Sequence, residues 1–159
     1  MKKAILFAIV VIAVLAQACT LEDKLNLCVT QEENIEKYIE KNYADSTVFV
    51  TDSGISRIVM VQGIGTAAQQ GDSVVFSYKG YTFNNSKGPD TQFAEGRIKE
   101  KLGSKRLIPG LDEGIVGMLQ GEQSYIAFSA RYGFFDQASG ALKPMTPLIY
   151  YVTLENIYR

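Results

Sequence analysis

Residues 107–121, with the sequence LIPGLDEGIVGMLQG, constrain the fold of this chain more than any other segment. A Pro-Gly pair followed by two acidic residues is typical of the first turn of a helix, where negative charge interacts favourably with the helix dipole. The apolar residues of the segment recur at helical spacing and share one face: Leu111, Ile115, Met118 and Leu119. Gly121 predicts the end of this helix. A helix this short is unstable in isolation, so it must pack into other structure.

The rest of the sequence predicts the sheet into which this helix packs. β-branched and alternating apolar residues predict four or five strands, among the segments 47–50, 55–61, 73–83, 124–130 and 148–154. Alternation assigns these side chains to one face of the sheet: Val74, Phe76, Tyr78, Ile126, Phe128, Leu148, Tyr150, Val152 and Leu154. Segments 84–106 and 131–147 are expected to be long connections. We therefore predict an α+β fold, in which an antiparallel half-barrel sheet wraps around one short central helix and both bury their apolar faces.

Composition excludes several classes of function. The chain has 159 residues, of which 47% are hydrophobic, enough for the core of one globular domain. The formal net charge is −1 and no basic run occurs, so a nucleic-acid partner is not expected. The sequence contains no histidine, which excludes histidine-based general catalysis and most transition-metal sites. We expect neither a metal nor a cofactor.

Residues 1–18 are predicted to be a signal peptide. Two lysines precede an apolar run at residues 4–15, which is too short for a comfortable membrane span. Two fates remain open for the exported chain. In the preferred one, the site resembles a bacterial lipobox, and Cys19 becomes the lipidated first residue of a lipoprotein anchored to a membrane of the cell envelope. In the other, the protein is soluble and periplasmic, and Cys19 and Cys28 can form a disulfide.

Two segments separate the signal peptide from the sheet. Residues 19–30 have no strong period and are expected to be an irregular tether for the lipid anchor. Residues 31–46 are predicted to contain an extra N-terminal helix. Its apolar stripe consists of Ile35, Tyr38 and Ile39. This helix is expected either to lie on the domain surface or to bind a partner or a second copy, and residues 47–159 form the predicted folded domain.

Six motifs, in this order along the chain, resemble the FKBP family of peptidyl-prolyl cis-trans isomerases. They are GDSVVFSYKG at 71–80, LIPGLDEG at 107–114, Met118, GE at 121–122, RYG at 131–133 and TPLIYYV at 146–152. The resemblance covers about residues 50–157, and the lead-in segment 52–65 is similar to that of exported bacterial FKBP-like lipoproteins. It implies an FKBP-like fold and an isomerase that assists protein folding. The implied partners are proline-containing polypeptide segments.

The resemblance also implies the residues of a substrate pocket. The positions that match the catalytic residues of the family are Tyr78, Phe93, Ile108 and Tyr132. The positions that match its substrate-binding residues are Ile98, Leu107, Leu111, Leu142 and Tyr150. In the family, the backbone N–H at the position of Ile108 binds a substrate carbonyl, and the hydroxyl at the position of Tyr132 reaches the ligand.

The pocket departs from the family pattern at one polar position. Ala94 follows Phe93 where the family has an aspartate, whose carboxylate lies beside the twisted amide. Asp90 could supply a carboxylate by another route, and Ile98 and Leu111 replace aromatic residues. Two functions therefore remain open, because a fold does not determine an activity. One is an exported isomerase of reduced activity, and the other is a non-catalytic FKBP-like module that binds peptides or proteins in the cell envelope.

Overall fold

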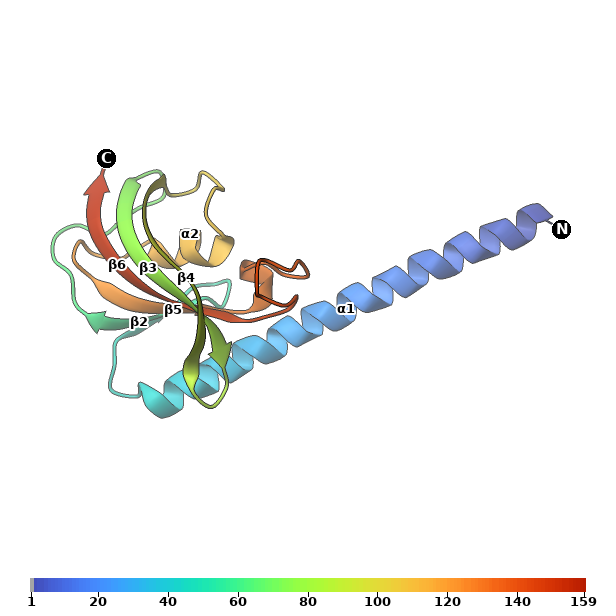
Figure 1. Ribbon diagram of the computed structural model, residues 1–159, viewed down its shortest axis with the longest axis horizontal. Helices are drawn as coiled ribbons and strands as arrows, with labels where there is room; N and C mark the ends of the chain where they lie inside the picture. The colour runs from blue at the N-terminus through green and yellow to red at the C-terminus, as the bar shows by residue number, and fades with distance from the viewer. Residues whose placement is uncertain (1) are drawn as a thin grey trace.

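The structure is a computed structural model that describes residues 2–159, with side chains from Thr20 onward. Its elements are two α-helices, six strands and one short 3-10 helix, η1, at Ala130–Tyr132 (Figure 1). The longest element is α1, Lys2–Asn42, whose C-terminal part lies against the sheet (Figure 1). The predicted lipidation site, Cys19, lies outside the residues with described side chains.

The six strands form one antiparallel sheet in the order β1-β2-β5-β6-β3-β4. Their bounds are β1 Val48–Val50, β2 Ser56–Val61, β3 Ser73–Asn84, β4 Gly88–Lys101, β5 Gln123–Phe128 and β6 Leu148–Tyr158. The sheet curves around the short helix α2, Pro109–Ile115 (Figure 1). The predicted antiparallel sheet around one short central helix, with an additional N-terminal helix, is confirmed.

Two glycines allow α2 to lie directly on the sheet. A Cβ atom at Gly110 would collide with the ring of Phe128, and one at Gly114 would collide with the side chain of Ile126. Both of these partners are fully buried residues of β5. The absence of side chains on this face of the helix therefore sets the distance between α2 and β5.

The helix α2 is shorter than its sequence pattern indicates. Pro109 lies in its first turn, where the missing N–H of proline costs no hydrogen bond. The helix ends at Ile115 after seven residues. Gly117 then adopts a φ of +87°, a backbone conformation that glycine accepts more readily than other residues. The prediction that the helix continues to Gly121 is therefore wrong.

The main core lies between α2 and the concave face of the sheet. The side chains that alternation assigns to one face are all buried in this core or packed against it: Val74, Phe76, Tyr78, Ile126, Phe128, Leu148, Tyr150, Val152 and Leu154. From α2, Leu111 and Ile115 complete the core. The predicted assignment of these residues to one face is confirmed.

The helix α1 covers part of the opposite face of the sheet and forms a second core. The apolar stripe of α1 is buried there against residues of four strands: Ile58, Phe83, Ala127 and Ile149. The Tyr38 ring meets the Phe83 ring edge-on, with 5.4 Å between the ring centroids. The Tyr38 hydroxyl donates a hydrogen bond to the carbonyl of Lys87 at 3.2 Å. The stripe predicted from the sequence is thus the face that contacts the sheet.

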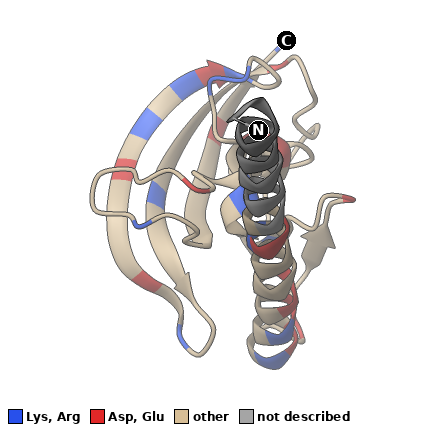
Figure 2. Ribbon diagram, turned by 90° about the vertical axis from the view of Figure 1, so that its right-hand side faces the viewer, with Lys and Arg blue, Asp and Glu red and all other residues tan. Residues whose placement is uncertain are grey.

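One segment expected to be a connection is a strand. Residues 88–101, within the segment 84–106, form β4, which has 14 residues and pairs with β3. Because β4 is the last strand of the sheet, many of its side chains remain in solvent. Acidic and basic residues are both distributed along this strand (Figure 2). Such charges disfavour pairing with another sheet. They also interrupt the apolar alternation by which a strand is recognised.

The segment expected to be an irregular tether is helical. Residues 20–30 continue α1, and Cys28 is a fully buried free thiol within this segment. Nine residues advance an α-helix by about 13 Å, whereas a disulfide requires Cα atoms within about 7 Å. The alternative pairing of Cys28 with Cys19 therefore does not fit α1. Among the residues with described side chains, no helix is long and apolar enough to span a membrane.

Candidate functional site

A pocket of about 380 Å³ lies between the start of α2, the strands β3, β4 and β6, and the pocket loop, as we name residues 129–147. Seven of the nine side chains that the resemblance implies line this pocket: Tyr78, Phe93, Ile98, Leu107, Ile108, Leu111 and Tyr150. These residues come from four segments that are far apart in the sequence, near positions 78, 93–98, 107–111 and 150. The antiparallel sheet and the helix inside it bring them together.

Three aromatic rings form one wall of the pocket. The rings of Tyr78 on β3 and Tyr150 on β6 have centroids 6.0 Å apart, and Phe93 on β4 meets Tyr150 edge-on at 5.7 Å. Gly80 permits this approach, because a Cβ atom there would lie 2.8 Å from Cε1 of Tyr150 and 2.9 Å from Cζ of Phe93. Phe128 stacks on Tyr150 from the core, with 5.9 Å between centroids. The wall is therefore a packed apolar surface of the kind that contacts an apolar ring.

Tyr150 keeps this wall uncharged. Its side chain is only 4% exposed, and burial raises the pKa of its phenol, with a smaller contribution from Tyr78. Burial has this effect because the phenolate is poorly solvated in an apolar environment. The Tyr150 hydroxyl therefore stays protonated at physiological pH.

The start of α2 supplies apolar contacts and one backbone donor. Ile108 is the N-cap residue, and its carbonyl accepts hydrogen bonds from the N–H groups of Leu111 and Asp112, both at 3.0 Å. The Ile108 N–H itself has no acceptor among the described residues. Backbone N–H groups at the start of a helix commonly lack an intrahelical partner. This N–H can therefore donate to a carbonyl of a peptide bound in the pocket.

No carboxylate is present among the described residues that line the pocket. Ala94 lies beside Phe93 in the lining. Asp90 is instead at the β3–β4 hairpin, where its carboxylate lies 3.6 Å from the ammonium of Lys87. The one charged lining residue is Arg106, a largely exposed side chain whose guanidinium is 3.8 Å from the Glu100 carboxylate.

Tyr132 and Leu142 do not line the pocket. Leu142 is buried in the main core, and Tyr132 is half-buried against it. The guanidinium carbon of Arg131 lies 4.9 Å from the centroid of the Tyr132 ring. The contact between the Tyr132 hydroxyl and a ligand, which the resemblance implies, stays a prediction.

The pocket loop supplies four lining residues that sequence reasoning missed: Phe134, Ser139, Gly140 and Ala141. The segment has no helical or strand period, so its side chains could not be assigned to a face. Its length was the one available signal, because long loops within compact domains are often functional.

A larger hollow of about 570 Å³ lies on the other face of the sheet. Most of its lining is polar or charged: Ser77, Lys79, Glu95, Arg97, Tyr151 and Thr153. Arg97 is already paired with Glu155, with 2.7 Å between Nε and the carboxylate oxygen. Ligand sites are usually apolar concavities with a few placed polar groups, which describes the smaller pocket better.

Residues 65–155 match the family model described as FKBP-type peptidyl-prolyl cis-trans isomerase. The chain belongs to this family. FK506-binding protein 1 of Aspergillus oryzae is 29% identical over an alignment of 114 residues, and the match covers 65% of this chain and 98% of that protein. FK506-binding protein 1 of Gibberella zeae is 31% identical over 109 residues, with the same coverage of both chains.

Solved FKBP structures share this fold. The structure of the three FKBP domains of wheat FKBP73 aligns with a TM-score of 0.63 and 22% identity, covering 70% of this chain and 50% of that one. The structure of FkpA from Escherichia coli aligns with a TM-score of 0.63 and 18% identity, covering 99% of this chain and 73% of that one. All pocket-lining residues fall within the family match, 65–155, whereas α1 lies outside it.

Proposed function

We propose that this FKBP-family protein is a peptidyl-prolyl cis-trans isomerase that binds proline-containing segments of folding proteins. One observation carries the proposal. The aromatic wall of Tyr78, Phe93 and Tyr150 lines the same pocket as Ile108, whose backbone N–H has no acceptor among the described residues. The pocket thus combines an apolar surface for a prolyl ring with a hydrogen-bond donor for a peptide carbonyl.

The chemistry of the reaction explains why such a pocket is sufficient. An X–Pro bond isomerises over a barrier of about 20 kcal/mol, because twisting the amide destroys its resonance. The reaction needs neither a proton transfer to a side chain nor a covalent intermediate. A protein accelerates it by binding the twisted amide more tightly than the planar one. Each ~1.4 kcal/mol of such preference raises the rate about tenfold.

Each part of the pocket has a role in this reaction. Phe93 and Tyr150 hold the prolyl ring, and Leu111 supplies an apolar contact from α2. The Ile108 N–H fixes a carbonyl of the peptide, so that the prolyl amide twists while the flanking chain stays bound. An uncharged, water-poor wall favours the twisted state, because the planar amide loses more hydration there than the twisted amide does.

The proposal is tested by the refolding of a protein whose slow step is prolyl isomerisation. We expect micromolar concentrations of the purified protein to accelerate this step. Phe93→Ala removes one ring of the wall and should reduce the acceleration. Phe49→Ala removes a half-exposed ring on β1, away from the pocket, and serves as the matched control. No acceleration by the unmodified protein would contradict the proposal.

A second function, peptide binding without catalysis, is favoured by one observation. Ala94 leaves the lining of the pocket without a carboxylate. Binding alone requires only the apolar wall and the backbone donor. If a proline-containing peptide binds in the pocket and refolding is not accelerated, the protein is a binding module.

We also propose that the protein is exported and anchored to a membrane of the cell envelope through a lipid on Cys19. The lysines and the apolar run of residues 1–18, and the cysteine that directly follows them, support this proposal. Mass spectrometry of the mature N-terminus is expected to find a lipid-modified Cys19. An unmodified cysteine at this N-terminus would indicate a soluble periplasmic protein, and a chain that still begins at Met1 would contradict export.

A further inference from the structure

The helix α1 contacts the pocket loop, although α1 lies outside the residues matched to the family. Gln31 makes the central contact. Its side-chain oxygen accepts a hydrogen bond from the Ala130 N–H at 2.9 Å, and its side-chain nitrogen donates to the Met145 carbonyl at 2.8 Å. One amide group therefore connects the beginning and the end of the pocket loop. Gln31 is only 8% exposed, so water competes poorly for these bonds.

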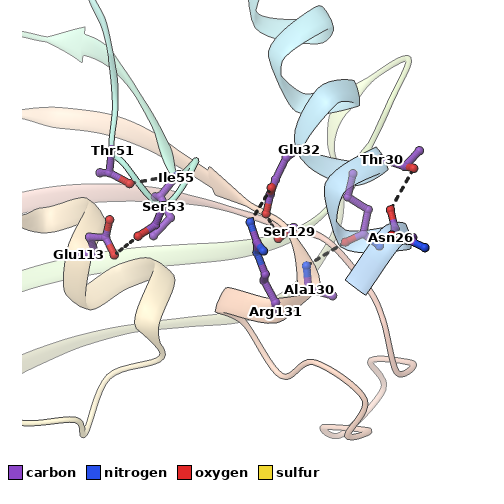
Figure 3. A network of polar contacts seen from close by, with 11 residues as sticks. Asn26, Thr30, Glu32, Thr51, Ser53, Ile55, Glu113, Ser129, Ala130 and Arg131 are labelled. Carbon is purple, nitrogen blue, oxygen red and sulfur yellow. Dashed lines mark hydrogen bonds and ion pairs between the residues drawn. The ribbon is translucent and has the colours of Figure 1, made fainter. Parts of the chain in front are cut away.

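Glu32 holds the beginning of the same loop through both oxygens of its carboxylate. One oxygen accepts from the Ser129 hydroxyl at 2.6 Å, and the other accepts from Nη2 of Arg131 at 2.7 Å (Figure 3). Hydrogen bonds between charged groups are stronger than neutral ones. The same Arg131 guanidinium lies over the ring of Tyr132. Glu32 is thus linked to Tyr132 through one intervening side chain.

The backbone of the pocket loop needs such support. Phe135 and Met145 have φ angles of +50° and +60°, in the left-handed region that is unfavourable for residues with side chains. Such conformations persist only where surrounding contacts impose them. The Met145 N–H donates to the Phe135 carbonyl at 2.6 Å, and the Phe135 N–H donates to the Ala130 carbonyl at 2.8 Å. Three of the four lining residues of the loop lie between Phe135 and Met145: Ser139, Gly140 and Ala141.

We propose that α1 braces the substrate pocket, and that Gln31 and Glu32 are positioning residues that hold the pocket loop in its binding geometry. The proposal rests on the proposed function of the pocket. It means that the family-matched segment 65–155 does not carry all the determinants of its own site. Part of the pocket geometry is set by residues about 100 positions earlier in the chain, at a separation of 99 residues for Gln31 and Ala130.

The bracing contacts are separate from the contacts that attach α1. The apolar stripe of α1, Ile35, Tyr38 and Ile39, holds the helix on the sheet. Within the described part of the chain, the hydrogen bonds of the Gln31 and Glu32 side chains go to the pocket loop alone. Removing these hydrogen bonds should therefore loosen the loop and leave the helix attached.

The test compares substitutions at neighbouring positions of α1 in the whole protein. Gln31→Met keeps the approximate shape of the side chain and removes both hydrogen bonds. Glu32→Gln removes the charge that holds Arg131. Glu33→Gln is the matched control, because it makes the same change one residue away, where the exposed carboxylate has only a 3.9 Å contact with Lys37. Exchange of the Ile126 amide, in the core strand β5, reports global stability.

Two measurements follow the loop and the pocket. Amide hydrogen exchange at Ala130 and at Leu142, whose N–H donates to the Ser139 carbonyl at 2.9 Å, reports the opening of the loop. Titration with an Ala-Leu-Pro-Phe peptide reports binding in the pocket. We expect Gln31→Met to accelerate exchange at both amides about tenfold and to weaken peptide binding about tenfold, as loss of buried hydrogen bonds predicts. Glu32→Gln should also accelerate exchange at both amides and weaken peptide binding. Glu33→Gln should leave exchange at both amides and peptide binding unchanged. Exchange of the Ile126 amide should be the same in all variants.

Several results would overturn the proposal. One is unchanged exchange at Ala130 and Leu142 in Gln31→Met and Glu32→Gln, and another is unchanged peptide affinity in both variants. An equal effect of Glu33→Gln would also overturn it, because the cause would then be the general loss of charge from α1. Failure of the unmodified protein to bind peptide or accelerate refolding contradicts the proposed function instead. In that case, accelerated exchange at both amides in the variants still supports the proposal that α1 holds the pocket loop, and unchanged exchange still overturns it.

Discussion

Ala94 is the pocket residue whose substitution is expected to change isomerase activity most. It lies next to Phe93 in the lining, and its methyl group leaves that position without a charge. A carboxylate there would interact with the dipole of the amide as it twists. We expect Ala94→Asp to raise isomerase activity about tenfold, equivalent to ~1.4 kcal/mol of transition-state stabilisation. The measurement is the rate of proline-limited refolding at fixed protein concentration.

Ala141→Asp is the control for this substitution. Ala141 also lines the pocket, but it lies on the pocket loop. Ala141→Asp therefore adds the same charge on a different side of the pocket. We expect no gain in rate from it. If Ala94→Asp leaves the rate unchanged as well, the pocket does not use a carboxylate at this position.

Arg57 and Glu122 form a buried ion pair away from the pocket. Their side chains are 7% and 2% exposed, with 3.4 Å between Nε of Arg57 and the carboxylate. Burial lowers the pKa of Arg57, while the Glu122 charge opposes this shift. Arg57 also donates from Nη1 to the carbonyl of Val116, directly after α2, at 2.8 Å. The pair therefore connects β2, the end of α2 and the start of β5.

We expect Arg57→Met to lower the free energy of unfolding by ~3–5 kcal/mol, because it leaves a buried carboxylate without its cation. Urea denaturation measures this loss. The double substitution Arg57→Met/Glu122→Gln removes both charges and should cost less than the single one. A larger loss in the double variant would show that the hydrogen bonds of Glu122 to its neighbours matter more than the ion pair.

At the scale of elements, the junction between α1 and the sheet contains tyrosines that are buried or partly buried. Tyr43 follows α1 and packs against the second core. Burial, with smaller contributions from Tyr38 and Tyr125, raises the pKa of Tyr43 from 10.0 to about 12. Its phenol is neutral when protonated, so the folded state holds the proton more tightly than the unfolded state does.

The alkaline stability of the protein should reflect this shift. Between pH 10 and about 12, the unfolded chain releases the Tyr43 proton and the folded chain retains it, so the free energy of unfolding falls as pH rises. Tyr43→Phe should make this fall shallower in denaturation measured across that range. Tyr158→Phe, at a side chain that is 48% exposed, is the control and should not change the slope. Equal slopes for all three proteins would contradict the assignment.

At the scale of the whole molecule, the sheet is covered on both faces. The helix α2 fills its concave face, and α1 covers part of the other face and reaches the pocket loop (Figure 1). Cys28 is fully buried on α1, and burial raises the pKa of its thiol above 9.0. Its reaction with a thiol reagent therefore requires α1 to separate from the residues that cover the thiol.

Thiol labelling of Cys28 should consequently measure how often the contact between α1 and the rest of the domain opens at this position. In protein carrying Cys19→Ser, we expect labelling at pH 7 to be slow in the native state and fast in urea. Ile35→Ala removes a fully buried contact of α1 with the sheet and should accelerate native-state labelling. Leu21→Ala, at an exposed position of the same helix, is the control. Rapid labelling of the native protein would contradict a stably docked α1.

Local sequence patterns determined most of the elements and the faces they bury. Helical and strand periods repeat within a few residues, so they are readable wherever one face is apolar and the other is not. This holds for Val74 and Phe76 in β3 and for Ile126 and Phe128 in β5. This pattern is not readable in β4, because the edge strand exposes charged side chains to solvent and its two faces do not differ clearly in polarity. The identity of the pocket residues came from the resemblance to a family, since no local pattern brings Tyr78 near Leu111.

Only the tertiary structure decided which residues meet at the pocket and what holds it. It placed Asp90 at a hairpin, left Ala94 without a carboxylate beside it, and added the residues of the pocket loop to the lining. It also showed that Gln31 bonds Ala130 across 99 residues of sequence. A polar residue within a helix carries no local sign of a partner that far away, because such contacts depend on the path of the whole chain. The sequence alone therefore determined most of the elements, and packing decided which of them form the site.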